Sequence, residues 1–358
     1  MKILLLGGSG AIGTPLALKL SALGVDVYVS SRSKNTRLNK IHFIKGNAKD
    51  KQFLKSVMST YWNAIVDFMN YTLEEFAERI DILLSNTDNY CFLSSSRIYA
   101  NTFTNPITEG SPLLLNTESD SLYLASNEYG LTKAKEEDAL KKTGQNNWTI
   151  FRPYIIYSEK RFQLGALEKE DWLKRVIDGK KIILHKSLRN KYTTLTYAPD
   201  AADVMAGIIM HPNTKCQVYN IVGGNTCRLT WGDIANIYQN LLRKKLGRKI
   251  EIEYITDKQQ QRLRPGKLYY QTSYDRIFNR VFDNSKILSF KSEDSFTTIQ
   301  DGLDEALSIF LESPQFLFSN QAQEAIIDSF TGEYSNLSKI NGLKNKFIYL
   351  YYRFIKKH

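Results

Sequence analysis

The sequence predicts an α/β fold built on a doubly wound parallel sheet, and three observations lead to that prediction. The chain opens with an apolar β run, a glycine-rich turn, a helical pattern and a second strand, in that order. Further short apolar strands then alternate with helical stretches, which is the pattern of parallel βα units. The length of 358 residues suits one large domain of this kind with a smaller lobe beside it.

The first βαβ unit is the most clearly marked element. Residues 2–6 are an apolar strand, and residues 13–23 carry leucines on one helical face. Glycines stand between them at positions 7, 10 and 13. Gly7 allows a tight turn, Gly10 lets backbone approach a pyrophosphate, and Gly13 lets the helix sit close to the sheet. The helix N-terminus then offers free N–H groups to a phosphate. The turn therefore predicts a dinucleotide site, although an ordinary tight βα turn would use the same residues.

The end of the second strand, which covers residues 25–30, indicates the type of dinucleotide. A site for NAD usually carries a carboxylate here for the ribose hydroxyls. This chain has Ser31, Arg32 and Lys34 and no acidic residue. A hydroxyl and a guanidinium suit a 2′-phosphate, so we expect NADP(H) in preference to NAD(H). The alternative is that these residues belong to a solvated loop.

Composition excludes several classes of protein. With 42% hydrophobic and 24% charged residues the chain is neither disordered nor fibrous, and its apolar runs are too short to cross a membrane. Three scattered cysteines predict no disulfide framework and no zinc site, and four histidines show no metal spacing. We therefore expect no metal, a reducing compartment and a cytoplasmic location. The net charge of +11 favours anionic partners.

A candidate catalytic segment follows two further apolar strands, residues 64–68 and 90–93. Three serines come directly after the second strand, and a polar helix opens later in the chain at Tyr129. Tyr129 and Lys133 are four residues apart, so they share one helical face. A nearby ammonium favours the ionised phenol, which could then exchange a proton with a substrate hydroxyl or carbonyl. Such a Tyr–Lys pair is also common on exposed helices.

Together these stretches resemble an extended short-chain dehydrogenase/reductase of the NAD-dependent epimerase/dehydratase family, of the nucleotide-sugar type. Five stretches match its motifs in chain order: Gly7 to Gly13 (G-x-x-G-x-x-G); Ser94 to Tyr99 with Pro106 and Glu109; Tyr129 and Lys133 (Y-x-x-x-K); Arg152 to Tyr157 (R-P-x-N-V-Y); and Val218 to Gly224 (Y-N-V-G-G). The similarity covers about residues 1 to 310.

The resemblance implies a Rossmann-like sheet with a smaller C-terminal α/β substrate lobe, and it assigns roles to residues. Ser95 would steady the reacting oxygen, Tyr129 would be the acid/base, and Lys133 would bind the nicotinamide ribose. The cofactor-binding residues would be Gly7, Ser9, Gly10, Ala11, Ile12, Gly13, Ser31, Arg32, Asn47, Ala48, Phe68, Asn70, Lys133 and Pro153. The substrate-binding residues would be Ser96, Arg97, Arg189 and Arg264.

Some family positions are changed. Ser96 and Arg97 stand where the dehydratase subgroup carries Asp and Glu, and Arg cannot act as the acid because it stays protonated. We therefore do not expect a 4,6-dehydratase. Arg97 could bind a substrate anion, or it could form a structural ion pair with Glu109 or another acid. The resulting expectation is an NAD(P)-dependent epimerase or keto-sugar reductase acting on a nucleotide sugar, as in polysaccharide biosynthesis. The alternative is a catalytically inactive protein of the same fold that binds RNA or a protein partner.

We expect the dinucleotide-binding domain to comprise residues 1–150 and 195–222, and the substrate lobe residues 151–194 and 223–312. Residues 313–358 form an extension past the usual family end. Its last 18 residues carry lysines, an arginine and aromatic residues but no acid. That composition suits either packing as a final helix or peripheral contact with an anionic membrane. We also expect a homodimer, and we do not expect nucleic acid as a partner.

Overall fold

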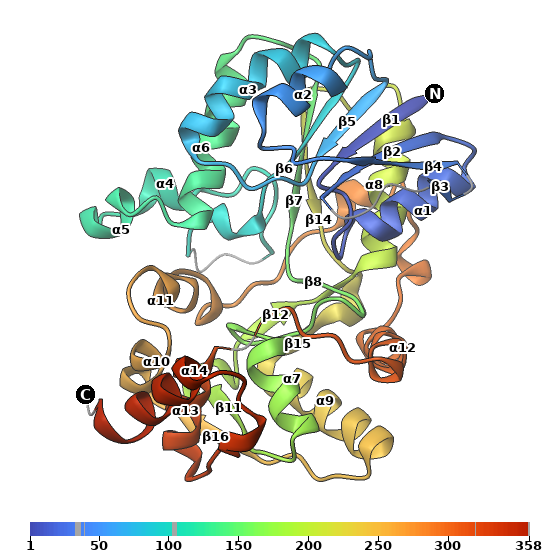
Figure 1. The fold of residues 1–358 in the computed structure, drawn as a ribbon. Coiled ribbons are helices and arrows are strands. Elements are labelled where there is room, and N and C mark those ends of the chain that lie inside the picture. The colour runs from blue at the N-terminus through green and yellow to red at the C-terminus, as the bar shows by residue number, and fades with distance from the viewer. Residues whose placement is uncertain (33–36, 39, 102–105, 319, 357–358) are drawn as a thin grey trace. The chain divides into compact units, whose positions relative to one another are not determined.

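The structure is a computed structural model, and it describes residues 1–32, 37–38, 40–101, 106–318 and 320–356. The chain divides into two compact units (Figure 1). Unit 1 consists of Met1–Tyr157, Thr194–Cys227 and Val281–Ile299. Unit 2 consists of Ser158–Thr193, Arg228–Arg280 and Gln300–His358. Unit 1 thus includes residues 151–157, 194, 223–227 and 281–299, which the sequence predicted for the substrate lobe.

Unit 1 is built on one large sheet whose strand order is β14-β7-β6-β5-β1-β2-β4-β3. Every neighbouring pair in the sheet is parallel except β3 with β4. The strands are β1 (Lys2–Leu6), β2 (Asp26–Ser31), β3 (Arg37–Leu38), β4 (Ile41–Lys45), β5 (Ala64–Asp67), β6 (Tyr90–Leu93), β7 (Trp148–Pro153) and β14 (Gln217–Ile221). The order reverses beside β1, as in a doubly wound dinucleotide-binding sheet. The predicted fold class is therefore confirmed.

Helices cover both faces of this sheet (Figure 1). The main ones are α1 (Gly13–Ala22), α2 (Lys51–Val57), α3 (Leu73–Ser85), α6 (Tyr129–Lys142) and α8 (Ala198–Met210). Leu4 and Leu6 pack in one core cluster with residues of α2, α3 and α6. Successive strand residues alternate faces, so Ile3 and Leu5 point to the opposite side. All four side chains are fully buried, which explains why β1 reads as a continuous apolar run.

Short elements complete unit 1. They are a 3₁₀ turn η1 (Ser96–Ile98), α4 (Leu114–Thr117), α5 (Ser121–Ala125), β8 (Ile156–Tyr157), β13 (Thr196–Tyr197), η3 (Asn225–Cys227), η5 (Ser285–Ile287) and η6 (Glu293–Ser295). The turn η1 directly follows β6 and holds the serine-rich segment. Its position at the carboxyl end of a central strand makes it part of the functional edge described below.

Unit 2 combines short strand pairs with helices. Its strands are β9 (Gln163–Leu164), β10 (Leu167–Glu168), β11 (Ile182–His185), β12 (Tyr192–Thr194), β15 (Arg228–Thr230) and β16 (Ile252–Ile255). Its helices are α7 (Lys169–Ile177), η2 (Lys186–Leu188), α9 (Trp231–Leu246), α10 (Asp257–Leu263), α11 (Lys267–Gln271), η4 (Thr272–Arg276), α12 (Ile299–Glu312), α13 (Gln321–Thr331), η7 (Leu337–Lys339), α14 (Leu343–Leu350) and η8 (Tyr351–Ile355). Strands β11 and β16 pair in parallel, and β9 and β10 form an antiparallel pair.

Candidate active site

The glycine-rich turn has the geometry that a dinucleotide phosphate requires. Gly7 has a φ of +68° and its N–H donates to Ser30 Oγ over 2.8 Å. A Cβ on Gly13 would lie 2.4 Å from the carbonyl oxygen of Gly8, so only glycine fits between turn and helix. A Cβ on Gly10 would meet nothing within 4 Å. Helix α1 starts after Ile12 with no side-chain cap, and in its first turn the N–H of Thr14 donates to the carbonyl oxygen of Gly10 over 3.1 Å.

Other predicted cofactor residues lie at the carboxyl ends of neighbouring strands. Arg32 is exposed directly after β2, and Ser31, the last residue of β2, is buried. Asn47 is exposed and Ala48 is buried after β4. Because the strands are parallel, these ends share one edge of the sheet with the glycine turn. Lys34, the second basic residue of the predicted phosphate site, is outside the described residues.

The predicted positions after β5 and β7 lie at the same edge. Phe68 is half-buried, and its N–H donates to the carbonyl oxygen of Leu6 at the end of β1. Asn70 is exposed, and Pro153 closes β7 in a half-buried position. The residues that the sequence assigned to the cofactor therefore come from successive strand ends of one sheet.

The turn η1, which follows Ser95, packs against the start of α6, where Tyr129 lies. Ser95 precedes η1, is almost fully buried, and its Oγ accepts from Arg97 N over 3.2 Å. Tyr129 is the first residue of α6 and is 39% exposed. A Cβ on Gly130 would lie 3.0 Å from the carbonyl oxygen of Arg97, so the helix start rests directly on the η1 backbone. That Ser95 and Tyr129 act on the same oxygen remains a prediction.

Lys133 lies at the carboxyl end of β5 and not in open solvent. Its side chain is almost fully buried, and its Nζ donates to the carbonyl oxygen of Met69 over 3.4 Å. The same ammonium pairs with Glu136 Oε2 at 3.0 Å and lies 4.6 Å from the centre of the Phe92 ring. Sequence reasoning missed Glu136, because an acid three residues after a lysine is an ordinary surface pair on a helix.

The surroundings of Lys133 hold a second carboxyl group. Asp67 is buried at the end of β5, where burial raises its pKa while Met69 N and the Tyr90 hydroxyl donate to it over 2.9 Å each. Burial likewise raises the pKa of Glu136 to about 6, against the opposing charge of Lys133. The lysine ammonium is thus held among two buried carboxyl groups and one carbonyl oxygen. This arrangement fixes its position at the carboxyl end of β5.

Arg97 forms an ion pair with Glu128, the residue before Tyr129, and neither side chain is more than slightly exposed. Its guanidinium also lies over the Tyr129 ring, 5.4 Å from the ring centre. The ion-pair alternative considered for Arg97 is therefore realised, with Glu128 and not Glu109 as the partner. The Arg97 guanidinium is thus held beside the phenol ring of Tyr129 by its ion pair with Glu128.

Ser96 does not present its hydroxyl to the site. The residue is fully buried, and its Oγ donates to the carbonyl oxygen of Arg152 over 2.7 Å. Its one hydroxyl hydrogen is engaged by the backbone, so the substrate contact expected from the sequence finds no support here. Ser96 instead joins η1 to the end of β7.

Several motif residues form one buried polar network beneath the site. Arg152 donates to both oxygens of Glu137, over 2.9 and 2.6 Å, and to the Tyr99 hydroxyl over 2.8 Å. Tyr99 in turn donates to Asn220 Oδ1 over 2.7 Å, and the N–H of Asn220 donates to Glu109 Oε1. Burial alone would raise the pKa of Glu137, but Arg152 more than offsets it and the pKa lies below its usual value. These motif residues hold β7, β14 and η1 together.

Arg189 and Arg264, the predicted diphosphate ligands, belong to unit 2. Arg189 is exposed, and its guanidinium lies 5.5 Å from the centre of the Tyr254 ring. Arg264 donates to Gln271 Oε1 over 3.1 Å. Their contact with a substrate remains a prediction.

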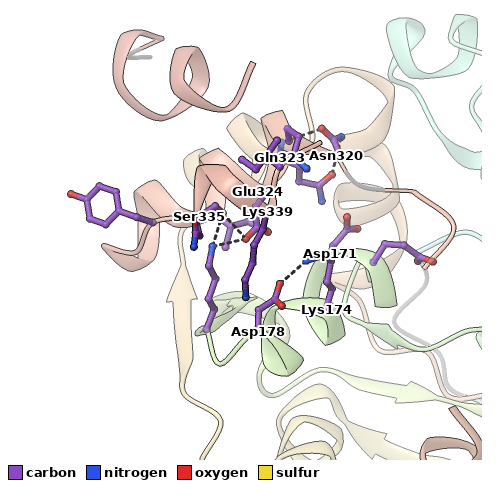
Figure 2. Close-up of a pocket in the computed structure, with 15 residues that line it drawn as sticks. Asp171, Lys174, Asp178, Asn320, Gln323, Glu324, Ser335 and Lys339 are labelled. Atoms are coloured by element: carbon purple, nitrogen blue, oxygen red, sulfur yellow. Dashed lines mark hydrogen bonds and ion pairs between the residues drawn. The ribbon is translucent and has the colours of Figure 1, made fainter. Parts of the chain in front are cut away.

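A separate cavity of about 240 Å³ lies within unit 2 (Figure 2). Figure 2 shows Asp171, Lys174 and Asp178 on one side and Glu324 from α13 on the other. Lys174 and Asp178 pair at 2.5 Å, and burial raises the pKa of Asp171 to about 6. No predicted site residue is among the described residues that line this cavity, so it is distinct from the edge of the sheet.

Comparison with known proteins agrees with this geometry. Residues 3–222 match the model of the NAD dependent epimerase/dehydratase family. A curated relative, the chloroplast stem-loop binding protein of 41 kDa b from Arabidopsis thaliana, is 25% identical over 237 residues. That match covers 62% of this chain and 58% of the relative, so it spans less than two thirds of the relative's length.

Solved structures share the fold at low sequence identity. UDP-glucose 4-epimerase from Bifidobacterium longum, in complex with NAD+ and UDP, is 17% identical with a TM-score of 0.65, covering 88% of this chain and 99% of that one. The enzyme WbmH from Bordetella bronchiseptica, in complex with NAD+, is 14% identical with a TM-score of 0.64 at the same coverage. At these identities the likeness shows the fold alone. The match of the family model over more than half of the chain goes further: this protein belongs to the NAD dependent epimerase/dehydratase family.

Proposed function

We propose that this chain is an NAD(P)-dependent oxidoreductase that acts on a nucleotide-activated sugar, as an epimerase or as a keto-sugar reductase. The proposal rests on the family membership, on the open glycine turn and on Ser95, Tyr129 and Lys133 at the same sheet edge. The solved relatives whose titles name NAD and UDP-sugars support the choice of substrate class.

One observation carries the proposal: Met69 contacts both the glycine turn and Lys133. A Cβ on Gly7 would lie 2.6 Å from Met69 Sδ, so this side chain rests on the glycine turn. The Met69 carbonyl oxygen accepts from Lys133. These contacts support a role for the Lys133 ammonium beside a dinucleotide that would be seated on the turn and extend along the strand ends. A lysine on an ordinary exposed helix face would not reach this edge.

Each residue then has a distinct task. A bound nicotinamide ring would supply a hydride acceptor or donor. Tyr129 takes the proton of the sugar hydroxyl as the C–H hydride leaves, and returns a proton when a carbonyl is reduced. Ser95 donates a hydrogen bond to the same oxygen. Lys133 holds a ribose hydroxyl and places positive charge near the phenol.

Specificity is the finer part of the proposal. Arg32 would recognise the 2′-phosphate of NADP(H), because a guanidinium makes bidentate contacts with phosphate. Arg97, already over the Tyr129 ring, would add a positive charge for an anionic group of the substrate. Arg189 and Arg264 would bind the diphosphate.

The experiment is a comparison of Tyr129→Phe with the unchanged chain. We expect NADPH binding to stay within about twofold, because the phenol oxygen serves chemistry and not cofactor binding. Turnover of an accepted nucleotide sugar, found by screening with NADPH and NADP and followed by NMR, should fall by about a hundredfold or more. Full activity of the variant would exclude Tyr129 as the acid/base.

A second candidate is an RNA-binding protein that has lost catalysis. The name of the curated relative, a stem-loop binding protein, and the net charge of +11 favour it. Titrations of the full chain with NADPH, NADH and a labelled RNA stem-loop separate the candidates. Micromolar dinucleotide binding without RNA binding supports the oxidoreductase, and tight RNA binding without dinucleotide binding supports the alternative.

A further inference from the structure

We propose that the last helix of the chain is a docking surface for an anionic lipid membrane. Helix α14 continues through the wide π turn η8, so one helical segment runs from Leu343 to Ile355. It packs against α13, which confirms the expectation of a final packed helix. The proposal concerns the opposite face of that segment.

The packed face of the segment is firmly anchored. Tyr349 is 2% exposed and joins Ala325 and Ile340 in a small apolar cluster. Its hydroxyl donates to Asp328 Oδ2 over 2.6 Å, and Asp328 also pairs with the buried Arg175 at 2.8 Å. The segment is therefore a fixed part of unit 2, and its orientation on α13 is determined by buried polar contacts.

The other face is unusually apolar for a surface. Large exposed side chains recur once or twice in each turn and form what we call the apolar stripe: Leu343, Phe347, Leu350, Tyr351, Phe354 and Ile355. Leu343 is 85% exposed and Phe347 is 66% exposed. Tyr334 stacks on Phe354 with 6.2 Å between ring centres and extends the stripe beyond the helix. Contiguous exposed apolar side chains of this kind mark an interaction surface.

Basic residues flank the apolar stripe. Residues 341–358 contain no acid, and Lys344, Lys346, Arg353 and Lys356 stand among the apolar positions. The guanidinium of Arg353 lies over the Tyr334 ring at 4.5 Å from its centre. Glu333, an acid next to this group, is already paired with Arg175 at 2.8 Å. The charge around the apolar stripe is thus positive.

This chemistry favours a lipid surface over the other occupants. A second copy meeting the same stripe across a two-fold axis would bring like charges together. RNA would use the basic and aromatic side chains but gain nothing from the exposed leucines and isoleucine. A membrane surface uses both parts: acyl chains accept the aliphatic and aromatic groups, and anionic headgroups attract the lysines. None of the helices in the described ranges is long and apolar enough to cross a membrane.

The test uses the full chain and sedimentation with vesicles. Vesicles of phosphatidylcholine containing one third phosphatidylglycerol should bind the protein, and vesicles of phosphatidylcholine alone should bind it much more weakly. The double variant Phe347→Ala/Phe354→Ala should lose about tenfold in partitioning. Lys344→Glu should lose about fivefold or more, because each basic group contributes about that factor near an anionic surface. Leu122→Ala, at a 77% exposed position of unit 1, is the matched control and should change nothing.

A spectroscopic variant reports the contact directly. The four native tryptophans are all buried. Phe347→Trp therefore adds one exposed tryptophan to the four buried ones. Its fluorescence emission should shift to shorter wavelengths with anionic vesicles only. Three results would each overturn the proposal. The first is equal vesicle binding by the double variant, and the second is an unshifted emission of Phe347→Trp. The third is binding of an RNA oligomer that is lost in the same variants while vesicles stay unbound. Concentration-dependent dimerisation lost in the double variant, again without vesicle binding, would assign the surface to a second copy.

Discussion

The ammonium of Lys133 lies 3.0 Å from the carboxylate of Glu136, and neither side chain is more than 3% exposed. The next residue, Glu137, is equally buried and pairs with Arg152 at 2.6 Å. The two adjacent acids differ in their electrostatics. Burial raises the pKa of Glu136 to about 6, whereas the pKa of Glu137 lies below its usual value despite burial. One acid is therefore costly to ionise in the fold, and the other is stabilised as an anion.

This contrast predicts opposite effects of removing each charge near neutral pH. Glu136→Gln should raise the free energy of unfolding by about 1–2 kcal/mol, because burial disfavours the charge it removes even with the Lys133 ammonium beside it. Glu137→Gln, the matched control, should lower it by about 3 kcal/mol, because Arg152 is left buried with a weaker partner. Urea unfolding of the three proteins measures both. Strong destabilisation of the Glu136→Gln protein would contradict the conclusion that burial makes the Glu136 charge unfavourable beside Lys133.

The same pKa shift predicts a pH dependence. A carboxyl whose folded pKa exceeds its unfolded value contributes stability that is complete below the unfolded value and is lost as pH rises through the folded value. For Glu136 the two values are 4.5 and about 6. The advantage of Glu136→Gln over the unchanged chain should therefore be absent near pH 4 and grow to about 2 kcal/mol by pH 7. Asp171, whose pKa is also near 6, titrates in both proteins and cancels in the difference. A difference that is constant over this range would refute the assignment.

Cofactor preference depends on Arg32, which is exposed after β2. Arg32→Ala should weaken NADPH binding by about tenfold or more and leave NADH binding within about twofold, because only NADPH has the 2′-phosphate. Lys55→Ala, at an exposed position on α2, is the matched control. Calorimetric titration measures the affinity of each of the three proteins for both dinucleotides. Equal weakening of NADPH and NADH binding would show that Arg32 does not recognise the 2′-phosphate.

Tyr99 belongs to a motif but has a structural position. Its hydroxyl is buried between Arg152 and Asn220. Tyr99→Phe should lower the free energy of unfolding by about 1–3 kcal/mol, since two buried polar groups lose a partner. Dinucleotide binding at saturating folded protein should be unchanged. Loss of binding with unchanged stability would instead place Tyr99 in the cofactor site.

The sequence was sufficient for the parts of the molecule that local rules determine. The glycine positions 7, 10 and 13 and the apolar strands predicted the parallel sheet and its functional edge, because turn geometry and periodicity are local. The partners of charged residues were not predictable in detail. Arg152 meets Glu137 from another element, and the sequence predicted for Arg97 an ion pair with Glu109 or another acid without identifying Glu128. The return of residues 281–299 to unit 1 also depends on tertiary packing. The role of Ser96 was also not predictable, because its hydroxyl donates to the carbonyl oxygen of Arg152 on a distant strand.

Binding of NADPH to Gly10→Ala tests the central claim, that a dinucleotide seats on the turn after β1. A Cβ on Gly10 meets no protein atom within 4 Å, so the variant should unfold at the same urea concentration as the unchanged chain. Gly110→Ala, whose Cβ would meet its nearest atom only at 4.0 Å, is the matched control and should bind NADPH normally. We predict that Gly10→Ala binds NADPH at least about tenfold more weakly, because the methyl group occupies the space of the pyrophosphate. Unchanged binding by a stable Gly10→Ala protein would contradict the account.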